Sequence, residues 1–146
     1  MSETEIEPPA QRTYRHEPIE LRIRADLTHL PVIRSVVGSV AAQADFDLDT
    51  IADLRLAVDE ACSTLIDAAR GESTLVCRFS VDDDVVLRFD GAVPSARPEP
   101  PSTGSFGWQI LTTLTSSAAT WLERDNPHGD SWLHIEITKA KAETGG

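Results

Sequence analysis

Cysteine and histidine are scarce in this chain, and their scarcity excludes two common ways of stabilising a small protein. The 146 residues include two cysteines, Cys62 and Cys77, and four histidines that occur singly along the chain. Two cysteines do not make a disulfide framework, and no histidine has a cysteine or a pair of carboxylates at metal-ligand spacing. We therefore expect two buried thiols and no structural metal site.

Basic residues and long apolar runs are also in short supply. The chain has 13 Lys and Arg against 24 Asp and Glu, which gives a formal charge of −11. This charge argues against direct binding of nucleic acid, and it favours a basic protein partner or simply maintains solubility. No apolar run approaches the roughly 18 residues of a membrane span, and the acidic N-terminus is unlike a secretory signal. We expect a cytoplasmic protein without membrane contact.

The chain is long enough for one domain with a hydrophobic core and too short for two ordinary ones. Residues 1–18 are polar, contain three prolines and show no apolar period, which predicts a flexible N-terminal tail. Residues 19–139 form the predicted domain. The polar residues 140–146 are predicted to be a C-terminal tail.

Apolar periodicity divides the predicted domain into strands and helices. The expected order is strand 19–25, helix 30–44, helix 50–69, a hairpin of strands 73–81 and 85–89, loop 92–103, a glycine-bearing turn at 104–108 that opens a helix, and strands 118–123 and 131–138. This order predicts an α/β fold, a two-layer sandwich in which helices cover one face of a mixed β-sheet.

Helix 50–69 carries the most informative pattern. Its apolar residues recur at steps of three and four, namely Ile51, Leu54, Val58, Ala61, Cys62, Leu65 and Ala69. Asp49 or Thr50 is expected to be the N-cap. At about 100° per residue, Asp53, Glu60 and Thr64 fall on a ridge at the edge of the buried face. A carboxylate in such a position can do acid–base chemistry.

The stretch Leu-Arg-Leu-Ala-Val-Asp-Glu-Ala-Cys-Ser-Thr at 54–64 resembles the helix that bears the catalytic glutamate in GHKL (Bergerat-fold) ATPases and kinases. Within that family it is most similar to the actinobacterial RsbW-type anti-sigma factors, and the resemblance covers roughly residues 19–139. It implies that Glu60 is the general base. It also implies that Thr64 stands where the family has an asparagine that holds Mg²⁺.

The resemblance further implies a site for ATP or ADP. The implied nucleotide ligands are Thr64, Asp90, Gly91, Gly104, Ser105, Gly107 and Ser131. Asp90 belongs to a shortened form of the family's Asp-x-Gly-x-Gly motif, whose aspartate binds the adenine amino group. The turn at 104–108 would offer amides to phosphate at a helix N-terminus, Ser131 would replace a phosphate-contacting threonine, and loop 92–103 would be the nucleotide lid.

Three functional hypotheses follow. By resemblance, the chain is an anti-sigma factor of the stress response that sequesters an alternative sigma factor and is counteracted by an anti-anti-sigma protein. Alternatively, it is a serine protein kinase that uses ATP and Mg²⁺ to phosphorylate that antagonist. A non-catalytic α/β binding module is the third hypothesis. The resemblance also favours a homodimer.

Helix 30–44 offers a candidate partner surface. Val32 and Val36 extend its apolar arc beyond what one sheet contact requires, and Arg34 lies between them. A broad core face would explain the two valines equally. The functional interpretation is an apolar rim at 32–36 that binds a protein partner.

Overall fold

The computed structural model describes residues 17–125 and 130–142, so most of the predicted N-terminal tail and residues 143–146 of the predicted C-terminal tail lie outside the described residues. The elements are β1 (Ile19–Arg24), the 3₁₀ helix η1 (Leu27–His29), α2 (Leu30–Gln43), α3 (Leu48–Ala68), β2 (Thr74–Asp82), β3 (Val86–Pro94), α4 (Phe106–Leu114), β4 (Ser117–Asp125) and β5 (Asp130–Ala140).

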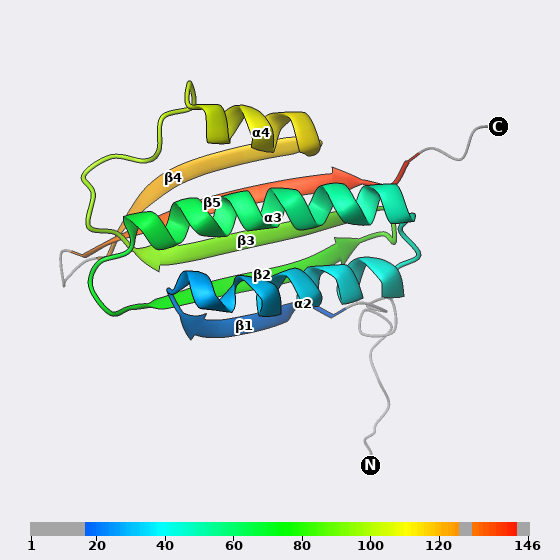
Figure 1. The fold of residues 1–146 in the computed structure, drawn as a ribbon, viewed down its shortest axis with the longest axis horizontal. Helices are drawn as coiled ribbons and strands as arrows, with labels where there is room; N and C mark the ends of the chain where they lie inside the picture. Colours follow the sequence, from blue (N-terminus) through cyan, green and yellow to red (C-terminus); the bar gives the residue numbers. More distant parts are fainter. Residues whose placement is uncertain (1–16, 126–129, 143–146) are drawn as a thin grey trace, which may run out of the picture.

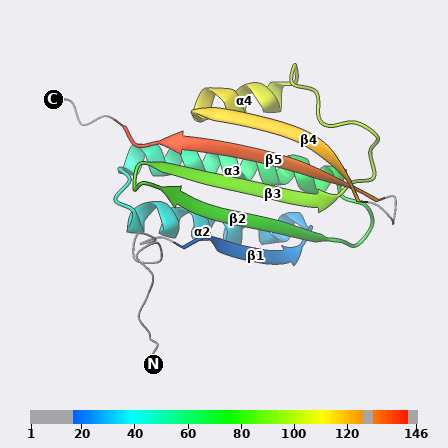
Figure 2. The same ribbon diagram turned by 180° about the vertical axis from the view of Figure 1, so that it is seen from behind.

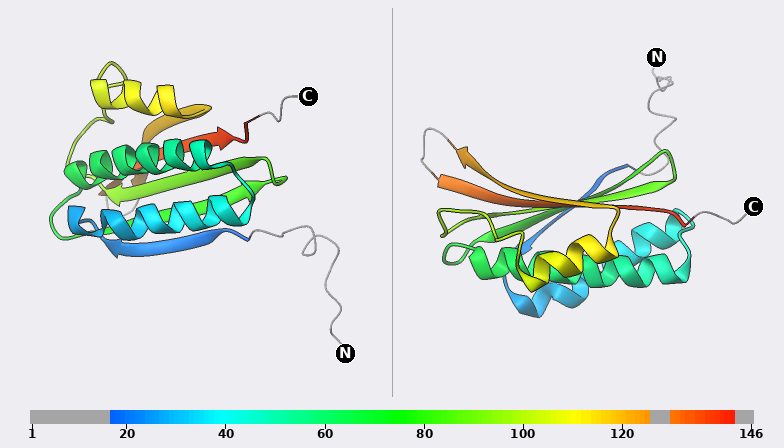
Figure 3. Two further views of the ribbon diagram at one scale, coloured as in Figure 1. Left: turned by 45° about the vertical axis from the view of Figure 1, so that its right-hand side comes forward. Right: turned by 90° about the horizontal axis from the view of Figure 1, so that it is seen from above.

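Five strands form one sheet in the order β1-β2-β3-β5-β4. The α-helices all cover the same face of this sheet (Figures 1 and 3), and the opposite face is free of helices in the described chain (Figure 2). The predicted two-layer α/β sandwich is confirmed. We call the face toward the helices the inner face and the opposite one the open face.

The sheet is antiparallel rather than mixed, which corrects one detail of the predicted fold. Each of the four neighbouring strand pairs is antiparallel. The chain crosses from β3 through α4 to β4, and β5 then inserts between β3 and β4. Because β5 runs antiparallel to both of its neighbours, no two adjacent strands are parallel.

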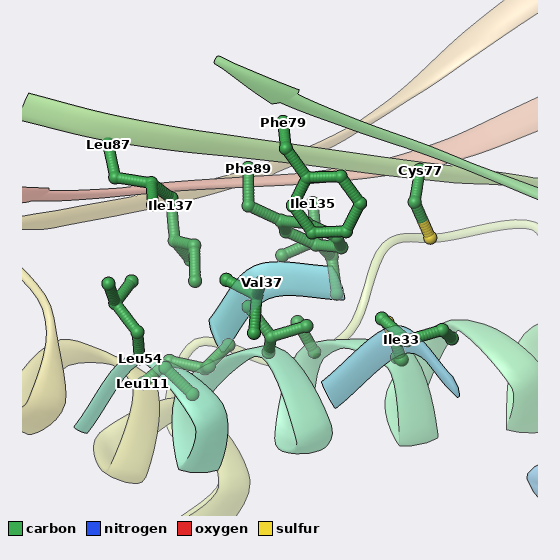
Figure 4. Packing of buried hydrophobic residues seen from close by; sticks show 14 of the residues in the cluster. Ile33, Val37, Leu54, Cys77, Phe79, Leu87, Phe89, Leu111, Ile135 and Ile137 are labelled. Atoms are coloured by element: carbon green, nitrogen blue, oxygen red, sulfur yellow. The ribbon is translucent and has the colours of Figure 1, made fainter. Parts of the chain in front are cut away.

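The core lies between the inner face of the sheet and the helices α2, α3 and α4, which contribute Val37, Leu54 and Leu111 (Figure 4). Phe79 and Phe89 from neighbouring strands have ring centroids 5.4 Å apart and are fully buried. Cys62 and Cys77 are free and buried, as predicted. The neighbouring Cys77 thiol and burial together raise the pKa of Cys62 well above its ordinary value, so this thiol stays protonated.

Two element boundaries differ from expectation near α3 and β5. Asp47 is the N-cap of α3, rather than Asp49 or Thr50, because its side chain accepts a hydrogen bond from the backbone N–H of Thr50 at 3.2 Å. At the other end of the chain, β5 continues to Ala140, and the backbone N–H of Lys141 donates to Val85. The C-terminal segment predicted from residue 140 therefore begins inside the sheet.

Strand β3 is also longer than predicted, and this has a consequence for the site. The predicted strand ended at residue 89, whereas β3 runs from Val86 to Pro94 and pairs with β5 along that length. The Asp90-Gly91 pair therefore lies within a central strand rather than at the end of one. In the described chain, no helix is long and apolar enough to cross a membrane.

Candidate functional site

Helix α3 presents two of the predicted site residues on one ridge. The Thr64 hydroxyl donates to the backbone carbonyl of Glu60 at 3.0 Å, and it lies 3.5 Å from Oε2 of the Glu60 side chain. Both residues are half-buried. Asp53, which was expected on the same ridge, instead lies 3.5 Å from Nζ of Lys139 on β5. The Glu60–Thr64 pair is thus the polar centre of this side of α3.

Helix α4 brings the glycine-bearing turn against Glu60. A Cβ at Gly107 would lie 2.5 Å from Oε2 of Glu60, so a larger residue there would displace the end of the Glu60 side chain. Ser105 is the N-cap of α4, and its Oγ accepts a hydrogen bond from the Trp108 backbone N–H at 3.2 Å. A carboxylate beside the first turn of a helix is stabilised by the free amides and partial positive charge there. The fold therefore joins Glu60, Thr64, Ser105 and Gly107.

A cavity of about 380 Å³ opens beside this centre. Its walls come from the C-terminal half of α3, the loop at 97–102 and β5, with Thr64, Asp67, Ala68, Arg97, Ser102 and Leu133 among the lining residues. The loop runs past the end of α3 before it enters α4 (Figure 1). This is the segment that the sequence resemblance identified as the lid.

The lid is attached at its start to both layers of the protein. The Ser95 N–H donates to the carbonyl of Ser131 on β5 at 2.8 Å, and the Ala96 N–H donates to the carbonyl of Ala68 at 2.9 Å. The Arg97 guanidinium then contacts Asp67 at 2.7 Å. Ser131, predicted to contact phosphate, thus holds the base of the lid through its backbone. Of the implied ligands, Gly104 lies farther along the same loop.

Arg97 is a site residue that the sequence pattern did not single out, and it pairs with Asp67 of α3. Asp67 follows Thr64 by three residues, so it falls on the same side of α3, and this spacing was a usable signal. Arg97 had no such signal because it lies in a proline-containing loop without any period. The contact between them joins residues that only the folded lid brings together.

The Asp90-Gly91 pair does not join this centre. Alternation along β3 places the side chain of Asp90 on the open face, where its Oδ1 lies 3.6 Å from Nδ1 of His134. Gly91 faces inward, and a Cβ there would lie only 2.7 Å from Cδ1 of Leu65. The structure therefore separates Asp90 from Glu60 by the thickness of the sheet. This corrects the expectation that both line one nucleotide site.

Mg²⁺ prefers carboxylate and other oxygen ligands in octahedral geometry. Within the described ranges, no group of three or more His, Cys, Asp or Glu side chains is placed to hold a metal ion. The Thr64 hydroxyl is engaged with the Glu60 carbonyl. These residues do not fit a magnesium ion held by the protein alone.

The predicted partner surface on α2 is divided in two by the fold. Val32 is 47% exposed, and it lines an open groove of about 570 Å³ between α2 and β1 together with Val36. The other lining residues are Ile19, Pro31, Ser35, Ser39, Val40 and Gln43. Arg34 points to α3 instead, where Nη2 lies 3.0 Å from Oδ1 of Asp59. Val36 is half-buried against the core, so it serves both the core and the groove.

Comparison with known proteins agrees with this architecture. The family described as histidine kinase-like ATPase domain matches residues 23–130. The anti-sigma-F factor RsbW of Mycobacterium tuberculosis is 38% identical over 128 residues, which cover 85% of this chain and 74% of that protein. A serine-protein kinase RsbW of Bacillus cereus is 31% identical over 83 residues, 54% of this chain and 52% of that protein.

A solved structure shares the fold. The RsbU and RsbW domains of Rv1364c from Mycobacterium tuberculosis superpose with a TM-score of 0.56 at 15% sequence identity, covering 87% of this chain and 34% of that one. Such low identity supports a common fold and nothing finer. The family match and the 38% identical relative show which family this is. The chain belongs to the histidine kinase-like ATPase domain family and, within that family, to the RsbW group.

Proposed function

We propose that this protein is an anti-sigma factor, which sequesters an alternative sigma factor and is counteracted by an anti-anti-sigma protein. The observation that carries the proposal is the 38% identity with the anti-sigma-F factor RsbW across 85% of this chain. Such a role in stress-responsive transcription needs a protein-binding surface rather than a nucleic-acid-binding one. The formal charge of −11 agrees with this requirement.

The groove between α2 and β1 supports the proposal. Its mostly apolar lining includes Val32, which is 47% exposed, and Ile19, which is 42% exposed. Exposed apolar side chains grouped at one place favour a protein contact, because covering them removes apolar surface from water. The sigma factor would occupy this groove. Arg34 takes no part in it, since it is paired with Asp59 on the other side of α2.

The test is a calorimetric titration of the cognate sigma factor with the Val32→Ser, Val36→Ser double variant. Loss of an apolar contact centre costs about 1–2 kcal/mol or more per residue, so we expect affinity to fall at least tenfold. Val85→Ser is the matched control, because Val85 is 49% exposed, lies in the β2–β3 turn and does not line the groove. Circular dichroism checks the folding of each variant.

Two results would count against this assignment. Wild-type affinity in a folded Val32→Ser, Val36→Ser variant would move the interface to another surface. A wild-type chain that binds no sigma factor would refute the function itself.

A second candidate, serine protein kinase activity toward the anti-anti-sigma protein, is favoured by the position of Glu60. Its carboxylate lies at the first turn of α4, next to a cavity and a lid, which is where a general base would meet a nucleotide and a hydroxyl substrate. Glu60→Gln should abolish phosphorylation, measured with labelled ATP. It should leave capture of the sigma factor unchanged, because the groove lies on the other helix. An equal loss of both activities would indicate a folding defect.

A nucleotide would bind in the cavity under the lid. Asp67 and Arg97 line this cavity, whereas Asp90 lies on the open face. We therefore expect Arg97→Ala to change the affinity for ATP or ADP, and Asp90→Asn to leave it unchanged. Calorimetry with and without Mg²⁺ gives both affinities, and it also shows whether Thr64 suffices in place of a metal-binding amide. A large effect of Asp90→Asn in a folded protein would contradict this location.

A homodimer is the proposed assembly, and the open face is its best-supported interface. Trp132, Arg22 and Arg78 border a shallow hollow of about 450 Å³ there, and tryptophan and arginine are enriched at protein interfaces. Acidic and basic side chains both lie on this face, among them Glu20, Arg22 and Arg78, and a second copy would offer each of them an opposite charge. Sedimentation equilibrium of wild type and Trp132→Ala tests the proposal, with a monomeric wild type as the refuting result.

A further inference from the structure

His134 on β5 is flanked by two carboxylates from the strands on either side of it. Its Nε2 lies 2.8 Å from Oε1 of Glu123 on β4, and its Nδ1 lies 3.6 Å from Oδ1 of Asp90 on β3. The imidazole also stacks on Trp121 of β4, with ring centroids 5.0 Å apart and planes 1° from parallel. The strand register places all four side chains on the open face of the sheet.

The chemistry of imidazole makes this arrangement sensitive to protonation. A neutral imidazole has one N–H donor and one acceptor nitrogen, so it can donate to only one of the two carboxylates. The imidazolium donates from both nitrogens. In the described chain, Nδ1 of His134 and Oδ1 of Asp90 are buried and have no hydrogen-bond partner. Their separation of 3.6 Å is an ion-pair distance that a small movement would shorten to a hydrogen bond.

The cations of the surrounding strands are occupied by other acids. Arg88 on β3 contacts Asp82 at 3.2 Å and Glu136 of β5 at 3.3 Å. On β1 and β2, Arg22 and Arg78 both approach Glu20. The hollow on the open face that Trp132 borders has one further charged residue at its rim, Arg124 of β4. For the described residues, the ion pairs of Asp90 and Glu123 are both made with His134.

We propose that His134 is a pH-sensitive clamp, whose imidazolium joins Asp90 of β3 to Glu123 of the edge strand β4 across β5. Strand β4 lies at the edge of the sheet and pairs with β5 alone. The clamp provides a second attachment for this edge strand, formed by side chains on the open face. The clamp uses no residue of the proposed nucleotide and sigma-factor sites, whereas Glu123 and His134 also line the hollow of the proposed dimer interface.

The direction of the effect follows from the environment of the ring. Asp90 raises the pKa of His134 most, Glu123 raises it further, and partial burial opposes them without reversing the rise. A group whose pKa is higher in the folded than in the unfolded state adds stability that is complete below the unfolded pKa, about 6.5. That stability disappears as pH rises through the folded pKa. Alkaline conditions therefore loosen β4.

The experiment measures urea unfolding of the full chain at several pH values from 5.5 to 8.5, for the wild type, His134→Gln and the control His29→Gln. The wild type and His29→Gln should lose stability as pH rises, as seen in a falling midpoint. His134→Gln should have a lower midpoint at pH 5.5, and the difference from the wild type should shrink by more than half at pH 8.5. A difference that is the same at every pH would overturn the clamp.

A direct titration keeps the proposal testable if His134→Gln does not fold. The ring proton of His134, followed by NMR in the wild type, should titrate above the ordinary value for histidine. In Glu123→Gln the same titration should shift to lower pH, because one of the two carboxylate partners is gone. A wild-type titration at or below the ordinary value, or no shift in Glu123→Gln, would refute the proposal.

Discussion

The two faces of the sheet are built from the same strands and yet hold the protein together by different means. On the inner face, Leu87 and Phe89 of β3 are fully buried beneath α3. On the open face, Arg88 and Asp90 of the same strand make ion pairs that are partly exposed to water. Hydrophobic burial stabilises by an amount proportional to area, whereas exposed ion pairs contribute little. We therefore assign most of the stability to the inner face and pH sensitivity to the open face.

Neighbouring residues have opposite surroundings because side chains alternate along a strand. Asp90 and Gly91 are adjacent in sequence, but one faces water and charge while the other faces Leu65 and the ring of Phe89. A shift of one residue in register would exchange these environments. Whether Asp90 faces the helices or the open face therefore depends on a register difference of one residue.

The largest expected effect is for truncation on the inner face. Phe89→Ala removes a fully buried ring that contacts Phe79, and should cost about 3–5 kcal/mol in free energy of unfolding. Trp121→Ala on the open face, where the ring is 38% exposed and stacks on His134, should cost about 1–2 kcal/mol. Urea unfolding at pH 7 compares the two. Equal losses would contradict the division of stability between the faces.

Gly91→Ala is expected to have the next largest effect. The added methyl would lie 2.7 Å from Leu65 and 2.9 Å from the Phe89 ring, and both of these side chains are fully buried and lack room to move. Overpacking of this kind typically costs about 1–3 kcal/mol. Gly104→Ala is the matched control, because its nearest neighbour would be Ser102 Oγ at 3.6 Å, an ordinary contact.

Unfolding midpoints of these two glycine variants give the comparison. A Gly91→Ala protein as stable as Gly104→Ala would mean that the space beside Leu65 is larger than the structure indicates. The inner face would then have room for a side chain at residue 91, including a polar one able to contact a ligand.

Much of the fold was readable from the sequence because it rests on periodicity. The three- and four-residue apolar spacing of α3 and the alternation in β5 predict burial. Buried as predicted are Ile51, Leu54, Val58, Ala61, Cys62, Leu65, Leu133, Ile135 and Ile137, whereas Ala69 is half-buried. The same logic, continued for one residue beyond Phe89, would have directed Asp90 to the open face. The predicted strand ended at residue 89, and Asp90 was assigned to the nucleotide site by the motif resemblance instead.

The remainder of the site could not be predicted because it depends on contacts between distant segments. The approach of Glu60 to Gly107 joins α3 to α4, and the contact of Arg97 with Asp67 joins the lid to α3. No local period encodes either contact. Likewise, Val32 of α2 lines the groove whereas Arg34 of the same helix contacts Asp59 of α3. The packing of α2 on α3 determines which residue takes which position.

The smallest expected effect is for the ion pairs of the open face. It directly tests the small contribution to the free energy of unfolding that we assign to these pairs. Arg88 contacts Asp82 and Glu136, and its side chain is 40% exposed. The two carboxylates raise its pKa, so it remains charged throughout the accessible pH range.

Because water and salt screen such pairs, Arg88→Gln should lower the free energy of unfolding by less than about 1 kcal/mol. The loss should diminish further in 1 M NaCl, where the screening length falls to about 3 Å. Urea unfolding at low and high salt measures both quantities. A loss of several kcal/mol that persists at high salt would contradict the small contribution assigned to these ion pairs.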